Sequence, residues 1–154
     1  MGLQGMINDL VKKSDFLLGD KLVGGIKDIQ NKSVNSIARM ISAAENCPQE
    51  HKKVLSEIRS IAKKSKIPVL GITGTGGAGK SSLVDELVRR FIMDFPKKNI
   101  AIVSVDPSKR KTGGALLGDR IRMNAIKSNQ VYMRSLATRQ ANLALSAHVN
   151  DALD

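Results

Sequence analysis

The chain contains no tryptophan, and aromatic residues make up only 3% of its 154 residues. Aromatic side chains are the platforms on which many proteins stack nucleic-acid bases, so their scarcity disfavours that mode of binding. Cysteine is nearly as scarce, because Cys47 is the single example. A disulfide within the chain is therefore excluded, and we expect a reducing, cytoplasmic location.

Long apolar runs are also missing. A membrane-spanning helix needs about 20 consecutive, mainly apolar residues, and the sequence has no such stretch. The first residues, MGLQGMINDLVKK, lack the apolar segment of a signal peptide, and Met6 stands where a myristoylation signal requires Ser or Thr. We therefore expect no membrane attachment.

Acidic residues are few, with 14 Asp and Glu against 25 Lys and Arg, which gives a net charge of +11. This balance favours an anionic partner such as a nucleotide, a nucleic acid, coenzyme A or an acidic lipid. Composition alone would favour RNA or DNA. Much of the positive charge, however, is spread between Lys12 and Lys66 in a pattern typical of solvated helix faces. Nucleic-acid binding is thus the weakest hypothesis, and we expect none.

Apolar residues amount to 42%, enough to build a core. Through Ser65 they recur at three- and four-residue steps, which predicts helices. From Ile67 the pattern changes. Strands are predicted at 67–73, 99–105 and 131–136, and helices at 81–95, 116–127 and 140–153. This alternation predicts an α/β fold with a parallel sheet and helices on both faces. Core positions of the first of these helices are expected at Leu83, Leu87, Val88, Phe91 and Phe95.

A glycine-rich stretch, GITGTGGAGKSSL, joins the first predicted strand to the first of these helices. Residues Gly74 to Ser81 match G-x-x-x-x-G-K-[ST], and the strand–loop–helix context is the one that a phosphate-binding P-loop requires. A chance glycine turn, or a dinucleotide-binding G-x-G-x-x-G, would leave Lys80 and Ser81 unexplained. The sequence therefore predicts a P-loop NTPase fold.

The composition of this loop follows from the shape and charge of a polyphosphate. Backbone N–H groups must converge on the phosphate oxygens, and side chains would obstruct them. The start of the following helix also favours an anion. Lys80 would offset charge on the outer phosphates, Ser81 would ligate Mg²⁺, and Ser82 would reach an inner phosphate.

A second group of candidate residues follows the second strand. Asp106 ends that strand, at the sheet edge where ligands of parallel sheets bind, so it is a candidate Mg²⁺ ligand; a capping or loop role is the alternative. A basic, glycine-containing loop then leads to Asp119, a possible second metal carboxylate, and to Arg122, a possible phosphate contact. This loop has the character of a nucleotide-dependent switch segment.

The motifs GTGGAGKSSL, VSVDPS and TGGALLGDRIRM, followed by VYMRSLATRQ, resemble those of the GTPases that escort cobalamin-dependent acyl-CoA mutases. The family includes separate chaperones and G-domains inside fused mutases. The resemblance implies a GTPase that gates cofactor loading and protects the mutase. Its cofactors would be GTP and Mg²⁺, with adenosylcobalamin only in the parent mutase. Its partners would be GTP or GDP and mutase domains in cis or in trans, with a homodimer possible in the full-length protein.

The same resemblance assigns roles to individual residues. Phosphates would be bound by Gly77, Ala78, Gly79, Lys80, Ser81 and Ser82, and Arg122 would contact the nucleotide. Mg²⁺ would be surrounded by Ser81, Asp106 and Asp119, with the Val105 carbonyl contributing. Lys80 and Asp106 would be the catalytic residues.

The resemblance also divides the chain. Residues 1–18 are similar to the last helix of a cobalamin-binding domain, 19–66 to a helical linker, and 67–154 to the first part of the GTPase domain. The chain is thus expected to be a fragment with Met1 internal and an incomplete sheet. In this family the guanine-reading motif comes after the segment that corresponds to this chain, which stops at Asp154. Discrimination of GTP from ATP is therefore not expected. A nucleotide-binding module without turnover, docking on a separate mutase, is the alternative function.

Overall fold

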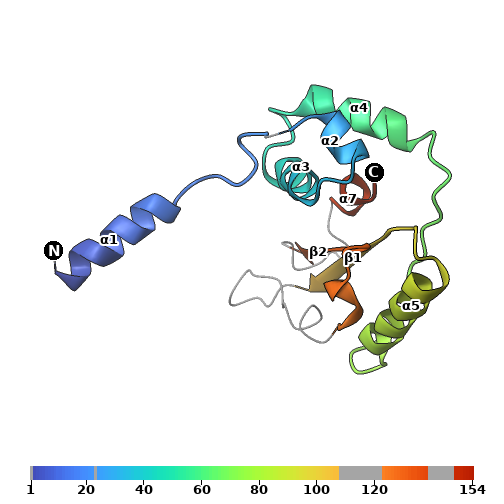
Figure 1. The fold of residues 1–154 in the computed structure, drawn as a ribbon. Coiled ribbons are helices and arrows are strands. Elements are labelled where there is room, and N and C mark those ends of the chain that lie inside the picture. Colours follow the sequence, from blue (N-terminus) through green and yellow to red (C-terminus); the bar gives the residue numbers. More distant parts are fainter. Residues whose placement is uncertain (1, 23, 108–122, 139–147) are drawn as a thin grey trace. The chain divides into compact units, whose positions relative to one another are not determined.

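The computed structural model describes residues 2–22, 24–107, 123–138 and 148–154. Its described residues form two compact units, Met1–Arg59 and Ser60–Asp154, which are treated separately below (Figure 1). The sequence suggested a boundary seven residues later, between 66 and 67. The assignment of residues 1–18 and 19–66 to a preceding domain and a linker stays a prediction.

The first unit is helical, as its apolar periodicity predicts. It contains α1 (Leu3–Ser14), α2 (Ile26–Gln30) and α3 (Val34–Asn46), followed by α4 (Lys52–Ala62), which continues into the second unit. Ser33 caps α3 by accepting a hydrogen bond from the Ser36 N–H. The core of this unit is a cluster of buried Met40, Ala44 and Leu55, so α3 and α4 bury part of the apolar stripes that predicted them.

The segment between α1 and α2 is fastened to α3 and to the turn that precedes α4. The Leu18 carbonyl accepts from Asn46, and the Gly19 carbonyl lies 2.7 Å from His51 Nε2. Gly19 has a φ of +97°, and a Cβ there would lie 2.7 Å from the backbone of Ala43. Only glycine fits so close to the helix with that backbone conformation.

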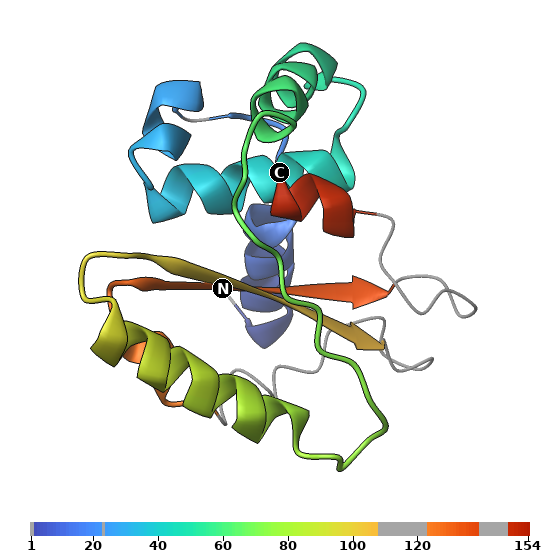
Figure 2. The same ribbon diagram turned by 90° about the vertical axis from the view of Figure 1, so that its right-hand side faces the viewer.

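The second unit combines strands and helices. Its elements are α5 (Lys80–Asp94), β1 (Ile100–Pro107), the 3₁₀ helix η1 (Ala125–Lys127), β2 (Val131–Thr138) and α7 (Val149–Leu153). The strands pair in parallel, from Ile100 opposite Val131 to Pro107 opposite Thr138. Figure 2 shows α5 on one side of this pair and α7 on the other. The α/β class, the parallel pairing and the helices on both faces are thus confirmed.

Burial in the second unit is sparser than the sequence suggested. Val88 of α5 is 2% exposed, and Met123, Met133 and Leu136 are also buried. Three positions predicted for the core are instead exposed: Leu83 and Leu87 of α5, and Phe95 at its C-cap. They are exposed because the described part of the unit has two strands, too few to cover the full apolar stripe of a 15-residue helix.

The predicted strand at 67–73 is wrong: no residue of this segment is in a strand, and Ile67 and Leu70 are 81% and 76% exposed. A strand exists only through hydrogen bonds to a neighbour, and none of the described residues pairs with it. The predicted helix at 116–127 lies outside the described residues through 122, and its end forms η1. Of the helix predicted at 140–153, the described end forms α7.

Within the described ranges, no helix has both the length and the apolar content that crossing a membrane requires.

Candidate functional site

The glycine-rich loop leads directly into α5, whose first residue is Lys80. Gly77 and Gly79 have φ values of +78° and +81°, a left-handed conformation that side chains disfavour. A Cβ at either position would meet no atom within 4 Å, so backbone conformation rather than crowding demands glycine here. Two glycines in the left-handed conformation therefore bend the chain immediately before α5 begins. Ala78 lies between the two bends, and its N–H donates to the Thr75 carbonyl at 3.3 Å.

The side chain of Lys80 folds back over the loop. Its Nζ donates to the Thr75 carbonyl oxygen at 2.8 Å. The aliphatic part passes Gly74, where a Cβ would lie 3.6 Å from Lys80 Cδ. The loop and the first residue of the helix thus hold one ammonium group at the site where the sequence predicts phosphate.

The N-terminus of α5 is suited to an anion. Gly79 is the N-cap and has no side chain to bond the first N–H groups, and the first turn carries no acidic residue. The first hydrogen bond of the helix runs from Leu83 N–H to the Gly79 carbonyl at 2.9 Å. A helix N-terminus carries about half a positive charge, which adds to that of Lys80. Ser81 is half-buried in this turn, and Ser82 is exposed.

The carboxyl end of β1 lies at the same end of the second unit as the start of α5 (Figure 2). The reason is topological: α5 ends at Asp94, and a short turn sends the chain back along β1. Val105 and Asp106 stand near this end of the strand, opposite Leu136 and Ala137 of β2. The structure describes the backbone of Asp106 but not its side chain, and it does not describe Asp119 or Arg122.

The donor atoms of this region fit a magnesium ion in chemical type. The Ser81 hydroxyl and the Val105 carbonyl are hard oxygen donors, which Mg²⁺ prefers, and Mg²⁺ is usually bound by few protein ligands together with phosphate oxygens. Roles for Ser81, Val105, Asp106 and Asp119 as ligands stay predictions.

One polar contact at α5 escaped the sequence reasoning. Asp85 Oδ1 accepts a hydrogen bond from the Ala125 N–H at 2.8 Å and so joins α5 to η1. Its spacing gave a signal: Ser81, Asp85 and Val88 are four and three residues apart and share one face of the helix. An acid aligned with a buried valine suggests a backbone partner, although the sequence does not identify it.

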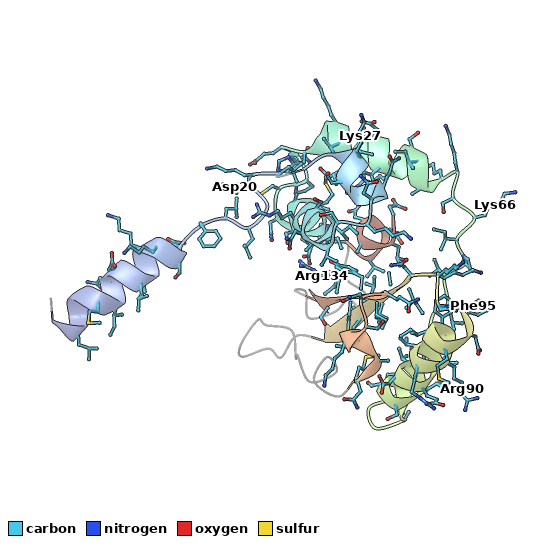
Figure 3. All side chains as sticks on the ribbon, viewed as in Figure 1. Asp20, Lys27, Lys66, Arg90, Phe95 and Arg134 are labelled. Carbon is cyan, nitrogen blue, oxygen red and sulfur yellow. The ribbon has the colours of Figure 1, made fainter. Side chains whose placement is uncertain are left out.

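The outer face of α5 carries an ion-pair network. Glu86 accepts from Arg89 at 2.8 and 2.9 Å and from Arg90 at 2.8 Å. These hydrogen bonds, with the two positive charges, lower the pKa of Glu86 to about 2. Arg90 extends away from the strand pair (Figure 3). This ion-pair network thus stabilises the exposed face of α5, and it does not involve Lys80 or the glycine-rich loop.

A parallel α/β unit with a glycine loop leading into a lysine-headed helix is typical of the P-loop class of nucleotide-binding proteins, and the strand expected before the loop is the one part of that context that the described residues do not form. Residues 37–154 match the family described as methylmalonyl-CoA mutase-associated GTPase MeaB. The chain belongs to this family, as its GTGGAGKSSL motif predicted.

Relatives extend this match to nearly the whole chain. A fused isobutyryl-CoA mutase of Geobacillus kaustophilus is 48% identical over 99% of the chain, and one of Cupriavidus metallidurans is 47% identical over 99%. A putative GTPase of Pyrococcus horikoshii is 36% identical over 87% of the chain and is covered over 40% of its own length. The chain spans 15% and 14% of the lengths of the two fused mutases.

Proposed function

We propose that the chain binds GTP together with Mg²⁺ and hydrolyses it, as the GTPase segment of a fused cobalamin-dependent acyl-CoA mutase of the isobutyryl-CoA type. The observation that carries this proposal is the glycine loop at the head of α5, with Lys80 bonded across it. Membership of the GTPase family and the fused relatives support the nucleotide and the mutase context.

In this proposal the β- and γ-phosphates lie against the N–H groups from Gly77 to Ser82. The Lys80 ammonium exchanges the neutral Thr75 carbonyl for charged phosphate oxygens, and the hydrogen bond is stronger when both partners are charged. Bound Mg²⁺ would neutralise charge that develops on the phosphates. Ser81 and Val105 would hold the ion with the predicted ligands Asp106 and Asp119, and Arg122 would contact the nucleotide.

Hydrolysis would then rest on positioning and electrostatics, as in other phosphoryl transfers. Lys80 stabilises the negative charge of the transferred phosphoryl group while water attacks in line. The helix N-terminus adds a fixed positive potential that requires no rearrangement during the reaction. The nucleotide state would act as a timer that gates cofactor loading and protects the mutase, in the cytoplasm.

The proposal is tested by titrating the whole chain with GTP and Mg²⁺ in a calorimeter. We expect a binding isotherm that Lys80→Ala weakens by about a hundredfold, because a charge-assisted contact worth about 3 kcal/mol is lost. Lys98→Ala is a matched control, since this lysine lies over the Phe95 ring at the far end of α5. Absence of heat with folded wild-type chain would contradict the proposal.

Phosphate release separates turnover from simple binding. We expect release from GTP with Mg²⁺ that Lys80→Ala abolishes. Binding without any release, in the chain alone and after addition of an acyl-CoA mutase, would favour a nucleotide-binding module that docks without turnover. Competition between GTP and ATP measures base preference in the same assay.

A further inference from the structure

Helix α5 carries Lys80, Ser81 and Ser82 of the proposed phosphate-binding residues, and its position therefore decides where they point. Among the described elements, its main packing partner is η1, and η1 also packs on β2. This short 3₁₀ helix thus links α5 to the strand pair. A change at the contact between α5 and η1 would change the direction of the Lys80 turn.

Two interactions of different character lie on the supporting face of α5. Val88 is buried and provides apolar contact, which has no preferred direction. Asp85 instead makes a directional hydrogen bond, 2.8 Å from its Oδ1 to the Ala125 N–H. Apolar contact at Val88 resists rotation of α5 only through packing, whereas the bond from Asp85 adds a directional restraint on that rotation.

Ser81 lies one helical turn before Asp85 on the same face. Any rotation of α5 would therefore carry Ser81 out of alignment by the same angle. We infer that Asp85 is a positioning residue for the phosphate and magnesium site: through the Ala125 N–H it fixes the rotation of α5 and so aims the Ser81 hydroxyl. This inference rests on the proposed function, because Ser81 is there the magnesium ligand.

The inference predicts a defect in a defined quantity, the factor by which Mg²⁺ strengthens GTP binding. Calorimetric titrations of the whole chain with GTP are compared in Mg²⁺ and in EDTA. We expect Asp85→Ala to lower this factor about tenfold, because small misplacements of a positioned group are costly. Affinity in EDTA, where Lys80 and the loop dominate, is expected to change less than threefold.

Conservative variants separate the hydrogen bond from the charge. The amide oxygen of Asp85→Asn still accepts from the Ala125 N–H, so this variant is expected to restore the magnesium factor to within about threefold of wild type. Asp94→Ala removes an exposed carboxylate from the last turn of the same helix and is expected to leave the factor unchanged. If Asp85→Ala fails to fold, Asp85→Glu replaces it, because it keeps the charge and displaces the acceptor.

The outcomes distinguish this inference from the proposed function. No GTP binding by the folded wild-type chain overturns the proposed function itself. Binding by wild type, with an unchanged magnesium factor in Asp85→Ala or Asp85→Glu, overturns the role of Asp85 alone. An equal loss of affinity in Mg²⁺ and in EDTA, or a defect in Asp85→Asn as large as in Asp85→Ala, also overturns it, since either shows general damage or a charge effect.

Discussion

The helical cluster of the first unit and the loop-and-strand region of the second use similar apolar residues with different results. In the first unit Met40, Ala44 and Leu55 meet across neighbouring helices and become buried. In the second, Ile67, Val69 and Leu70 precede the glycine loop and are mostly exposed. Helices close to one another in sequence find partners locally, whereas a strand needs a neighbour that the chain supplies from a distance. An apolar run is therefore better evidence of burial when its partner is near in sequence.

The largest effect is expected from Leu55→Ala, which removes a buried side chain from the helical core of the first unit. Leu55 is 5% exposed in the core of α3 and α4. The substitution should lower the free energy of unfolding by about 3 kcal/mol, from lost burial and the cavity left behind. Urea denaturation followed by circular dichroism measures it, with Ile61→Ala on the more exposed face of α4 as control. Equal losses of unfolding free energy in the two variants would show that Leu55 is no better buried than Ile61.

Gly19→Ala should have the next largest effect. The new Cβ would lie 2.7 Å from the Ala43 backbone at a φ of +97°, so the segment must shift away from α3. We expect a loss of about 2 kcal/mol in the free energy of unfolding, from strain and displaced contacts. Gly2→Ala, where a Cβ meets no atom within 4 Å, is the control for the same urea experiment. A neutral Gly19→Ala would show that this segment is not held against α3.

A smaller and pH-dependent effect is expected at the exposed face of α5. Because the pKa of Glu86 is lowered from 4.5 to about 2, its stabilising contribution is fully present above pH 4.5 and disappears as the pH falls through about 2. Solvent screening keeps this contribution small. Glu86→Gln should therefore slightly lower the melting temperature at pH 7 and leave it unchanged near pH 2. A difference of the same size at both pH values would exclude the ion pairs as its cause.

The smallest effect is expected from Val69→Ser. Val88→Ser is its reference, because it changes the same residue type in a buried position. Val69 is 67% exposed and Val88 is 2% exposed. We expect Val69→Ser to alter the free energy of unfolding by less than about 0.5 kcal/mol and Val88→Ser to lower it several times more. Similar losses in the two variants would indicate that residues 67–72 pack against a partner in solution.

The elements of the second unit could be predicted to different degrees. β1 and β2 could be predicted because each is a short apolar run. α5 could be predicted because a P-loop motif leads into a helix and because a proline follows the helix. Whether residues 67–73 form a strand could not be predicted from these residues alone, because hydrogen bonds to another segment decide it. Leu83 and Leu87 have core spacing, yet they are exposed, because the two described strands cover only part of the apolar stripe of α5.

The sequence by itself determined the helices of the first unit, the glycine-rich loop before α5 and the family, because each depends on the identity and spacing of neighbouring residues. Glycine at 77 and 79 and lysine at 80 already specify the bends and the charge that the structure contains. Only the tertiary structure decided that Asp85 meets Ala125 and that Val88 rather than Leu87 is buried. Those outcomes depend on which segments, 40 residues apart in the case of Asp85, meet in space.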